Sequence, residues 1–219
     1  MKMRIASLSL LALCLTLAAV PAMAQTVYSN GPTNGNTDAW TVNFGFIVSD
    51  TFNTNSANTQ ITGVNFAMWM FPGDVLSSAE VSITSSENGG TSYFDQTVSF
   101  SQSGCVGNNY GYNVCSEAGT LGGGGVNLAS QGTYWLNVQN ASVASGDPVY
   151  WDENSGPSSA SENTVGTIPS ESFTVLGSES STTTSTSTTT TGTVPEPSSI
   201  MLFGSGILGL AGMLRRKLF

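Results

Sequence analysis

The side chains that could do chemistry in residues 25–194 are acids, hydroxyls, amides and aromatic rings, because this stretch contains no Lys, Arg or His. Without histidine, a Ser-His-Asp nucleophile and an imidazole-based zinc site are excluded. Without cations, nothing can neutralise a phosphate backbone, so nucleic acid is excluded as a partner. The stretch holds 13 of the chain's 14 acids, all but Glu196: Asp38, Asp50, Asp74, Glu80, Glu87, Asp95, Glu117, Asp147, Asp152, Glu153, Glu162, Glu171 and Glu179.

Three of these acids gather in GDPVYWDENSGPSS (146–159), namely Asp147, Asp152 and Glu153. Calcium binds several oxygen ligands, which loops can supply, so a calcium site is conceivable in this segment. The spacing of the acids, however, matches no calcium-binding loop. A glycosidase needs two acids facing each other across a cleft of about 5 to 10 Å. Asp152 and Glu153 point to opposite sides if they lie in a strand. The segment favours a solvated loop, and we predict that the protein is not an enzyme and needs no cofactor.

Aromatic residues offer a second kind of site. Tyr110, Tyr112, Tyr150 and Trp151 lie near predicted loops, where their rings could stack on sugar rings. The candidate ligand surface consists of Tyr110, Tyr112, Trp151 and Asp152. The alternative is that aromatic rings supply the core of a small sandwich. The inward positions of predicted strands favour that role for Trp40, Phe44, Phe46, Phe66 and Tyr134.

Two cysteines remain in this stretch, Cys105 and Cys115, which frame the loop CVGNNYGYNVC. In an exported chain such a pair predicts one disulfide, which for this loop length stabilises by about 3 kcal/mol. A redox or metal pair is the alternative, but the spacing differs from C-x-x-C and no other soft ligand is at hand.

The elements that must position these residues are short runs of alternating apolar and polar residues. WTVNFGFIV (40–48) and GVNFAMWMF (63–71) each place an apolar row on one face, and Trp69 falls on the face opposite to Val64, Phe66, Met68 and Met70. Asn-Gly and Pro-Gly pairs separate the runs. Short strands with turn residues between them predict a single all-β domain, an antiparallel sandwich, over residues 25–177.

The two ends of the chain predict export. Lys2 and Arg4 precede an apolar run that ends in Pro-Ala-Met-Ala, which is the pattern of a signal peptide (1–24) cleaved between Ala24 and Gln25. Residues 178–193 are rich in Ser and Thr, with STTTSTSTTTT at 181–191, and such a run cannot bury a core. We expect it to be an extended linker whose hydroxyls can carry sugars.

The last segment, residues 194–219, begins with Val-Pro-Glu-Pro and continues into the apolar run SSIMLFGSGILGLAGML (198–214). This run is short for a transmembrane helix, which normally needs about 20 apolar residues. Arg215, Arg216 and Lys217 then keep the C-terminus on the cytoplasmic side. A short glycine-bearing helix that ends in a basic cluster is typical of a removable C-terminal signal.

This order of Pro195, Glu196 and Pro197, a short apolar helix and the cluster Arg215–Lys217 resembles the PEP-CTERM sorting signal. The resemblance implies an exosortase as processing partner, removal of the tail, and release or attachment at the cell surface. It also implies export across the inner membrane, a transient membrane anchor and a host that makes exopolysaccharide. The domain itself is similar to jelly-roll-like domains found beside such anchors.

These observations lead to two predictions of function. The first is a structural or interaction protein of the extracellular matrix, associated with exopolysaccharide and sorted to the surface by an exosortase. The alternative is a carbohydrate-binding module, with or without calcium. A hydrolase that uses two carboxylates is a third hypothesis, which requires a facing pair of acids.

Overall fold

The computed structural model describes residues 24–180. The signal peptide before Ala24, most of the linker and the whole sorting segment lie outside these residues. The described part is all-β, and all of its strand pairs are antiparallel. The predicted fold class is therefore confirmed at this level.

The described residues form thirteen strands and one short 3-10 helix, Gly122–Gly124. No helix among residues 24–180 is long and apolar enough to cross a membrane. The strands are β1 Gln25–Ser29, β2 Ala39–Thr41, β3 Val48–Thr54, β4 Thr59–Met70, β5 Leu76–Ser86, β6 Gly89–Gly107, β7 Asn113–Thr120, β8 Val126–Leu128, β9 Gly132–Val143, β10 Tyr150–Asp152, β11 Ala160–Glu162, β12 Gly166–Ile168 and β13 Phe173–Ser178.

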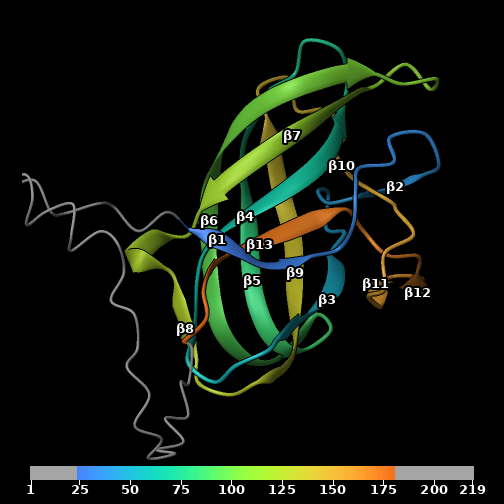
Figure 1. Cartoon of the computed structure of the whole chain (residues 1–219). Helices are drawn as coiled ribbons and strands as arrows, with labels where there is room; N and C mark the ends of the chain where they lie inside the picture. Colours follow the sequence, from blue (N-terminus) through green and yellow to red (C-terminus); the bar gives the residue numbers. More distant parts are fainter. Residues whose placement is uncertain (1–23, 181–219) are drawn as a thin grey trace, which may run out of the picture. The chain divides into compact units, whose positions relative to one another are not determined.

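Two sets of strands share the long strand β6. Sheet A runs in the order β1-β13-β4-β7-β6, with β10 also paired to β4 and to β2. Sheet B runs β6-β5-β9-β3-β11-β12. β6 pairs with β5 along its first part and with β7 along its last part, so the β6–β7 hairpin projects from sheet A beside β4 (Figure 1). The tip of that hairpin carries Tyr110 and Tyr112.

The core lies between the inner faces of the two sheets. Val64, Phe66, Met68 and Met70 on β4 are buried with residues of sheet B such as Leu136 on β9. The predicted alternation of β4 is confirmed, because Ala67 and Trp69 instead form a separate small cluster on the outer face with Val114, Tyr112 and Tyr150. Phe66 and Tyr134 are core residues as predicted, and Trp40 packs against the core from a partly buried position.

One predicted strand was wrong. Residues 40–48 do not form one strand. β2 ends at Thr41, β3 begins at Val48, and a turn joins them. The chain crosses here from sheet A to sheet B. Phe46 donates its backbone N–H to Asn43 O at 3.1 Å, and Phe44 takes a left-handed φ of 59°. Phe44 is 65% exposed and Phe46 is 37% exposed, so neither is a core residue.

The predicted disulfide is confirmed. Cys105 on β6 is bonded to Cys115 on β7, ten residues later, and Cys115 is buried in the core cluster. The bond therefore closes the β6–β7 hairpin behind its tip. It ties the loop that carries Tyr110 and Tyr112 to the sheet.

Candidate ligand-binding pocket

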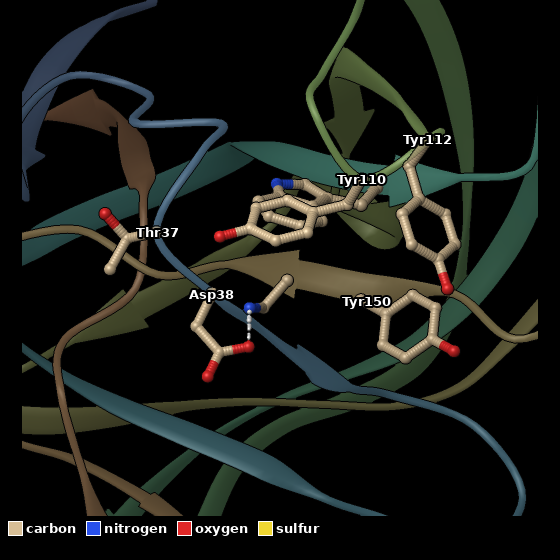
Figure 2. Close-up of a pocket in the computed structure, with 7 residues that line it drawn as sticks. Thr37, Asp38, Tyr110, Tyr112 and Tyr150 are labelled. Carbon is tan, nitrogen blue, oxygen red and sulfur yellow. Dashed lines mark hydrogen bonds between the residues drawn. The ribbon is translucent and has the colours of Figure 1, made fainter.

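A pocket of about 370 Å³ lies on the outer face of sheet A. It is lined by Thr37, Asp38, Ala39, Trp69, Tyr110, Tyr112 and Tyr150. Four of these seven residues are aromatic and one is an acid. Figure 2 shows Tyr110 in the centre of the view, with Tyr112 and Tyr150 to one side and Thr37 and Asp38 to the other.

Strand register brings the aromatic residues together. Trp69 on β4 lies opposite Tyr150 on β10 and opposite Val114 on β7. Tyr110 and Tyr112 come from the β6–β7 loop, where the side-chain Oδ1 of Asn108 accepts both of their backbone N–H groups at 3.0 Å. Neighbours on one face of a sheet are close enough for such rings to touch. The pocket thus combines residues of three strands, β2, β4 and β10, with the β6–β7 loop and the loop before β2.

The rings are arranged as a stacked pair and an edge-on pair. Tyr110 stacks on Trp69 with ring centroids 5.7 Å apart and an interplanar angle of 22°. Tyr112 meets Tyr150 edge-on at 5.4 Å. Trp69 is only 4% exposed, whereas Tyr110 is 59% exposed. The surface that a ligand meets first is therefore the outer side of Tyr110, supported from below by Trp69.

Burial and a hydrogen bond with Tyr112 raise the pKa of Tyr150 to about 12. Its phenol therefore remains protonated across the physiological range. Tyr150 and Thr37 thus offer hydroxyls, and Asp38 offers a carboxylate, around the aromatic rings.

Asp152 holds the pocket together from behind. Its Oδ1 accepts the indole N–H of Trp69 at 2.7 Å and the backbone N–H of Gly35 at 2.7 Å, and its Oδ2 accepts the backbone N–H of Asn34 at 2.8 Å. Burial raises the pKa of this carboxyl, and these three hydrogen bonds act in the opposite direction. Gly35 has a φ of +74°, a conformation that suits glycine and aims its N–H at the carboxylate.

Two of the four residues of the candidate ligand surface belong to the pocket and two do not. Tyr110 and Tyr112 line it, but Trp151 and Asp152 are both fully buried. The prediction for Trp151 was wrong because it faces inward from β10, where it contacts Phe66 and Phe173 and donates its indole N–H to Ser172 O. Asp152 faces outward, but Trp69 and the loop at Asn34 cover it.

We expect Asp152→Asn to lower the free energy of unfolding by about 1–3 kcal/mol, because an amide NH₂ would then face the N–H of Asn34. Urea unfolding monitored by circular dichroism measures this loss. Asp147→Asn is the matched control, since no side-chain hydrogen bond involves the Asp147 carboxylate within residues 24–180. Equal urea midpoints for the two variants would contradict the anchoring role of Asp152.

Two acids of the segment 146–159, Asp152 and Glu153, have hydrogen-bond donors within the protein. Asp152 is occupied with backbone and indole donors, and Glu153 accepts the indole N–H of Trp40 at 3.3 Å. Within residues 24–180, no three acid, cysteine or histidine side chains are placed to hold a metal ion together.

Several acids are buried outside the pocket. Glu117, which faces inward from β7, and Glu171, just before β13, are fully buried, and neither carboxyl accepts or donates a hydrogen bond within the described residues. Burial raises the pKa of Glu117 to about 8. Burial, assisted by the charge of Asp50, raises the pKa of Glu171 well above its usual value. The protonation of these two carboxyls therefore affects the stability of the fold.

Sequence reasoning missed Trp69, Asp38 and Thr37 as parts of one site. A signal for Trp69 was available, because a tryptophan on the face of a strand opposite to its apolar row must find another partner or meet solvent. Thirty residues separate Trp69 from Asp38, and only the pairing of β2, β10 and β4 brings them to one place. No local sequence pattern predicts that pairing.

The comparison with known families concerns the C-terminus. The PEP-CTERM protein-sorting motif matches residues 193–217. The chain therefore carries this motif, as its sequence predicted, and the motif implies export and processing by an exosortase. None of the curated proteins compared with the chain matches it.

Proposed function

We propose that this chain is an exported, surface-sorted protein whose β domain binds a glycan through the aromatic pocket. The observation that carries the proposal is the stack of Tyr110 on Trp69, with one broad ring exposed and hydroxyl and carboxylate groups beside it. A sugar has an apolar C–H face and polar edges, so it matches both parts of this surface. This favours the carbohydrate-binding alternative for the domain itself.

The dimensions of the pocket agree with this function. Its volume of about 370 Å³ falls within the range of roughly 300–1,000 Å³ that small-molecule sites occupy. The contacts of Trp69 with Tyr110 and Asp152 hold the rings in place, so little ordering would oppose binding. A surface that is pre-arranged in this way suits one or two sugar units of a longer chain.

Binding without hydrolysis is part of the proposal. Asp38 is the single acid among the residues that line the pocket. A hydrolase of the two-carboxylate kind needs a second acid in the same cleft. The composition of the pocket therefore supports a binding module.

The wider role that we propose is attachment of the protein to the exopolysaccharide or matrix around the cell. In this scheme the precursor is held in the inner membrane by its C-terminal segment until an exosortase removes that segment. The Ser/Thr-rich residues 178–193 then act as a spacer. The strand order, in which β6 belongs to both sheets, supports a jelly-roll-like sandwich for the ectodomain.

The sorting part is tested by the intact mass of the protein recovered from its native host, separately from membrane and medium. We expect a product that starts at Gln25 and ends near Pro195–Pro197. Tryptic peptides would serve poorly, because the chain has no Lys or Arg between Arg4 and Arg215. A chain intact through Phe219 in the membrane fraction would contradict processing.

The binding part is tested by screening the recovered protein against a glycan array and titrating the hits by calorimetry. Tyr110→Ala is expected to weaken binding at least about tenfold, because it removes the exposed ring of the stack. Tyr93→Ala is the matched control: Tyr93 is 42% exposed on β6 and does not line the pocket. No binding to any glycan, or equal losses for the two variants, would contradict the proposal.

A further inference from the structure

The charges around the pocket restrict which sugars it can select. Asp38 is exposed at the pocket, and its Oδ1 accepts the backbone N–H of Ala39 at 2.8 Å (Figure 2). Within residues 24–180, its other oxygen accepts no hydrogen bond from a side chain or backbone group. One oxygen of a carboxylate therefore remains available to a ligand at the edge of the aromatic rings.

Further acids reinforce this negative charge from beneath. Asp152 lies under Trp69, and Glu153 follows it in the chain and receives the indole N–H of Trp40. Burial raises the pKa of Glu153 and the charge of Asp38 adds to this effect, so Glu153 lies within electrostatic range of Asp38. No Lys, Arg or His occurs anywhere in residues 25–194 to offset them.

The aromatic rings also favour a positively charged ligand. The faces of Trp and Tyr carry the negative end of the ring quadrupole and attract cations placed over them. Four such rings, those of Trp69, Tyr110, Tyr112 and Tyr150, surround the space that Asp38 borders. A neutral sugar would use the rings and the hydroxyls but leave the free carboxylate oxygen with water. An acidic sugar would be repelled.

We propose that the glycan preferred by this pocket carries a protonated amine, as an amino sugar whose nitrogen is not acetylated does. The ammonium group lies against the free oxygen of Asp38 while the apolar face of the sugar stacks on Tyr110. This inference rests on the proposed glycan-binding function and adds the charge of the ligand to it. Removing the charge by N-acetylation leaves the sugar ring unchanged, which gives a matched pair of ligands.

The experiment compares a glucosamine tetramer with its fully N-acetylated counterpart, titrated by calorimetry into the protein as recovered from its host. At pH 6 and low salt, the glucosamine tetramer is expected to bind at least about tenfold more tightly. The preference should shrink in 1 M salt, where charges are screened beyond about 3 Å. Asp38→Asn should abolish the preference.

Asp95→Asn is the matched control for general attraction of a cationic oligomer to an acidic domain, because Asp95 is an exposed acid on β6 that does not line this pocket. It should leave the preference intact. If Asp38→Asn retains the preference, or if the N-acetylated tetramer binds as tightly or more tightly, the inference is wrong while the glycan-binding function stands. If neither tetramer nor any arrayed glycan binds, both proposals are wrong.

Discussion

Raising the pH from 5 to 9 is expected to lower the midpoint of thermal unfolding by about 10 °C, a loss of stability on the order of 4 kcal/mol. Glu117 alone accounts for a loss of this size, because it is fully buried on β7 and has no hydrogen-bond partner within residues 24–180. Its carboxyl must be neutral to remain in this site, and burial raises its pKa from the usual 4.5 to about 8.

The direction of this pH effect on stability follows from the linkage between proton binding and folding. The folded state holds the Glu117 proton up to about pH 8, whereas the unfolded chain releases it near pH 4.5. The stabilisation is therefore complete below about pH 4.5 and is lost progressively as the pH rises through 8. Asp50, whose pKa is raised to about 6 mainly by burial, and Glu171 act in the same direction.

Glu117→Gln tests this assignment, because it removes the ionisation and nearly keeps the shape. Its thermal midpoint should depend less on pH than that of the wild type, and it should exceed the wild-type midpoint at pH 9. Glu87→Gln, at an exposed acid beside the β5–β6 turn, is the control and should follow the wild type. A wild-type midpoint that rises between pH 5 and 9 would show that Glu117 is not buried as described, whether or not the variant folds.

Removing the Cys105–Cys115 disulfide is expected to cost about 3 kcal/mol of stability by the loop-closure argument and also to weaken glycan binding. The second effect arises because the bond closes the hairpin whose tip carries Tyr110 and Tyr112. Without it, ordering that loop would oppose binding. The double variant Cys105→Ser with Cys115→Ala suits the measurement, since Cys105 is exposed and Cys115 lies in the core.

Urea unfolding and calorimetric titration of this double variant measure the two effects separately. Val106→Ala is a control, because Val106 is 68% exposed on the same strand and keeps the disulfide in place. A double variant with the wild-type urea midpoint and wild-type affinity would show that the bond neither stabilises the domain nor fixes the pocket.

Much of the fold could be predicted because it depends on local patterns. The alternation in β4 separates Phe66 and Met68 from Trp69, and period-two burial requires only that one face of a strand meets the core. The disulfide followed from the count of cysteines in an exported chain. The same reasoning failed at Phe44, where a crossing between sheets needed a turn and overrode the alternation.

The pocket depended on information that is not local. Tyr110 and Tyr112 could be proposed as ligand-binding residues because a Gly- and Asn-rich loop holds them out from the sheet. Trp151 was misplaced because its direction depends on where β10 joins β4, and a shift of one residue reverses every side chain. That register also turns Asp152 toward Trp69, so that Asp152 holds the Trp69 ring in place by a hydrogen bond.

The measurement that tests the central claim most directly is the spectrum of the four tryptophan indole N–H groups, in ¹⁵N-labelled protein, as the best-binding glycan is added. Trp69 is the single tryptophan that lines the pocket, whereas Trp135 lies on β9 in the other sheet and Trp151 lies in the core. The account predicts a large shift of the Trp69 resonance, with Trp135 and Trp151 unchanged. A shift of Trp135 with Trp69 unmoved would contradict it, because the ligand would then bind on sheet B.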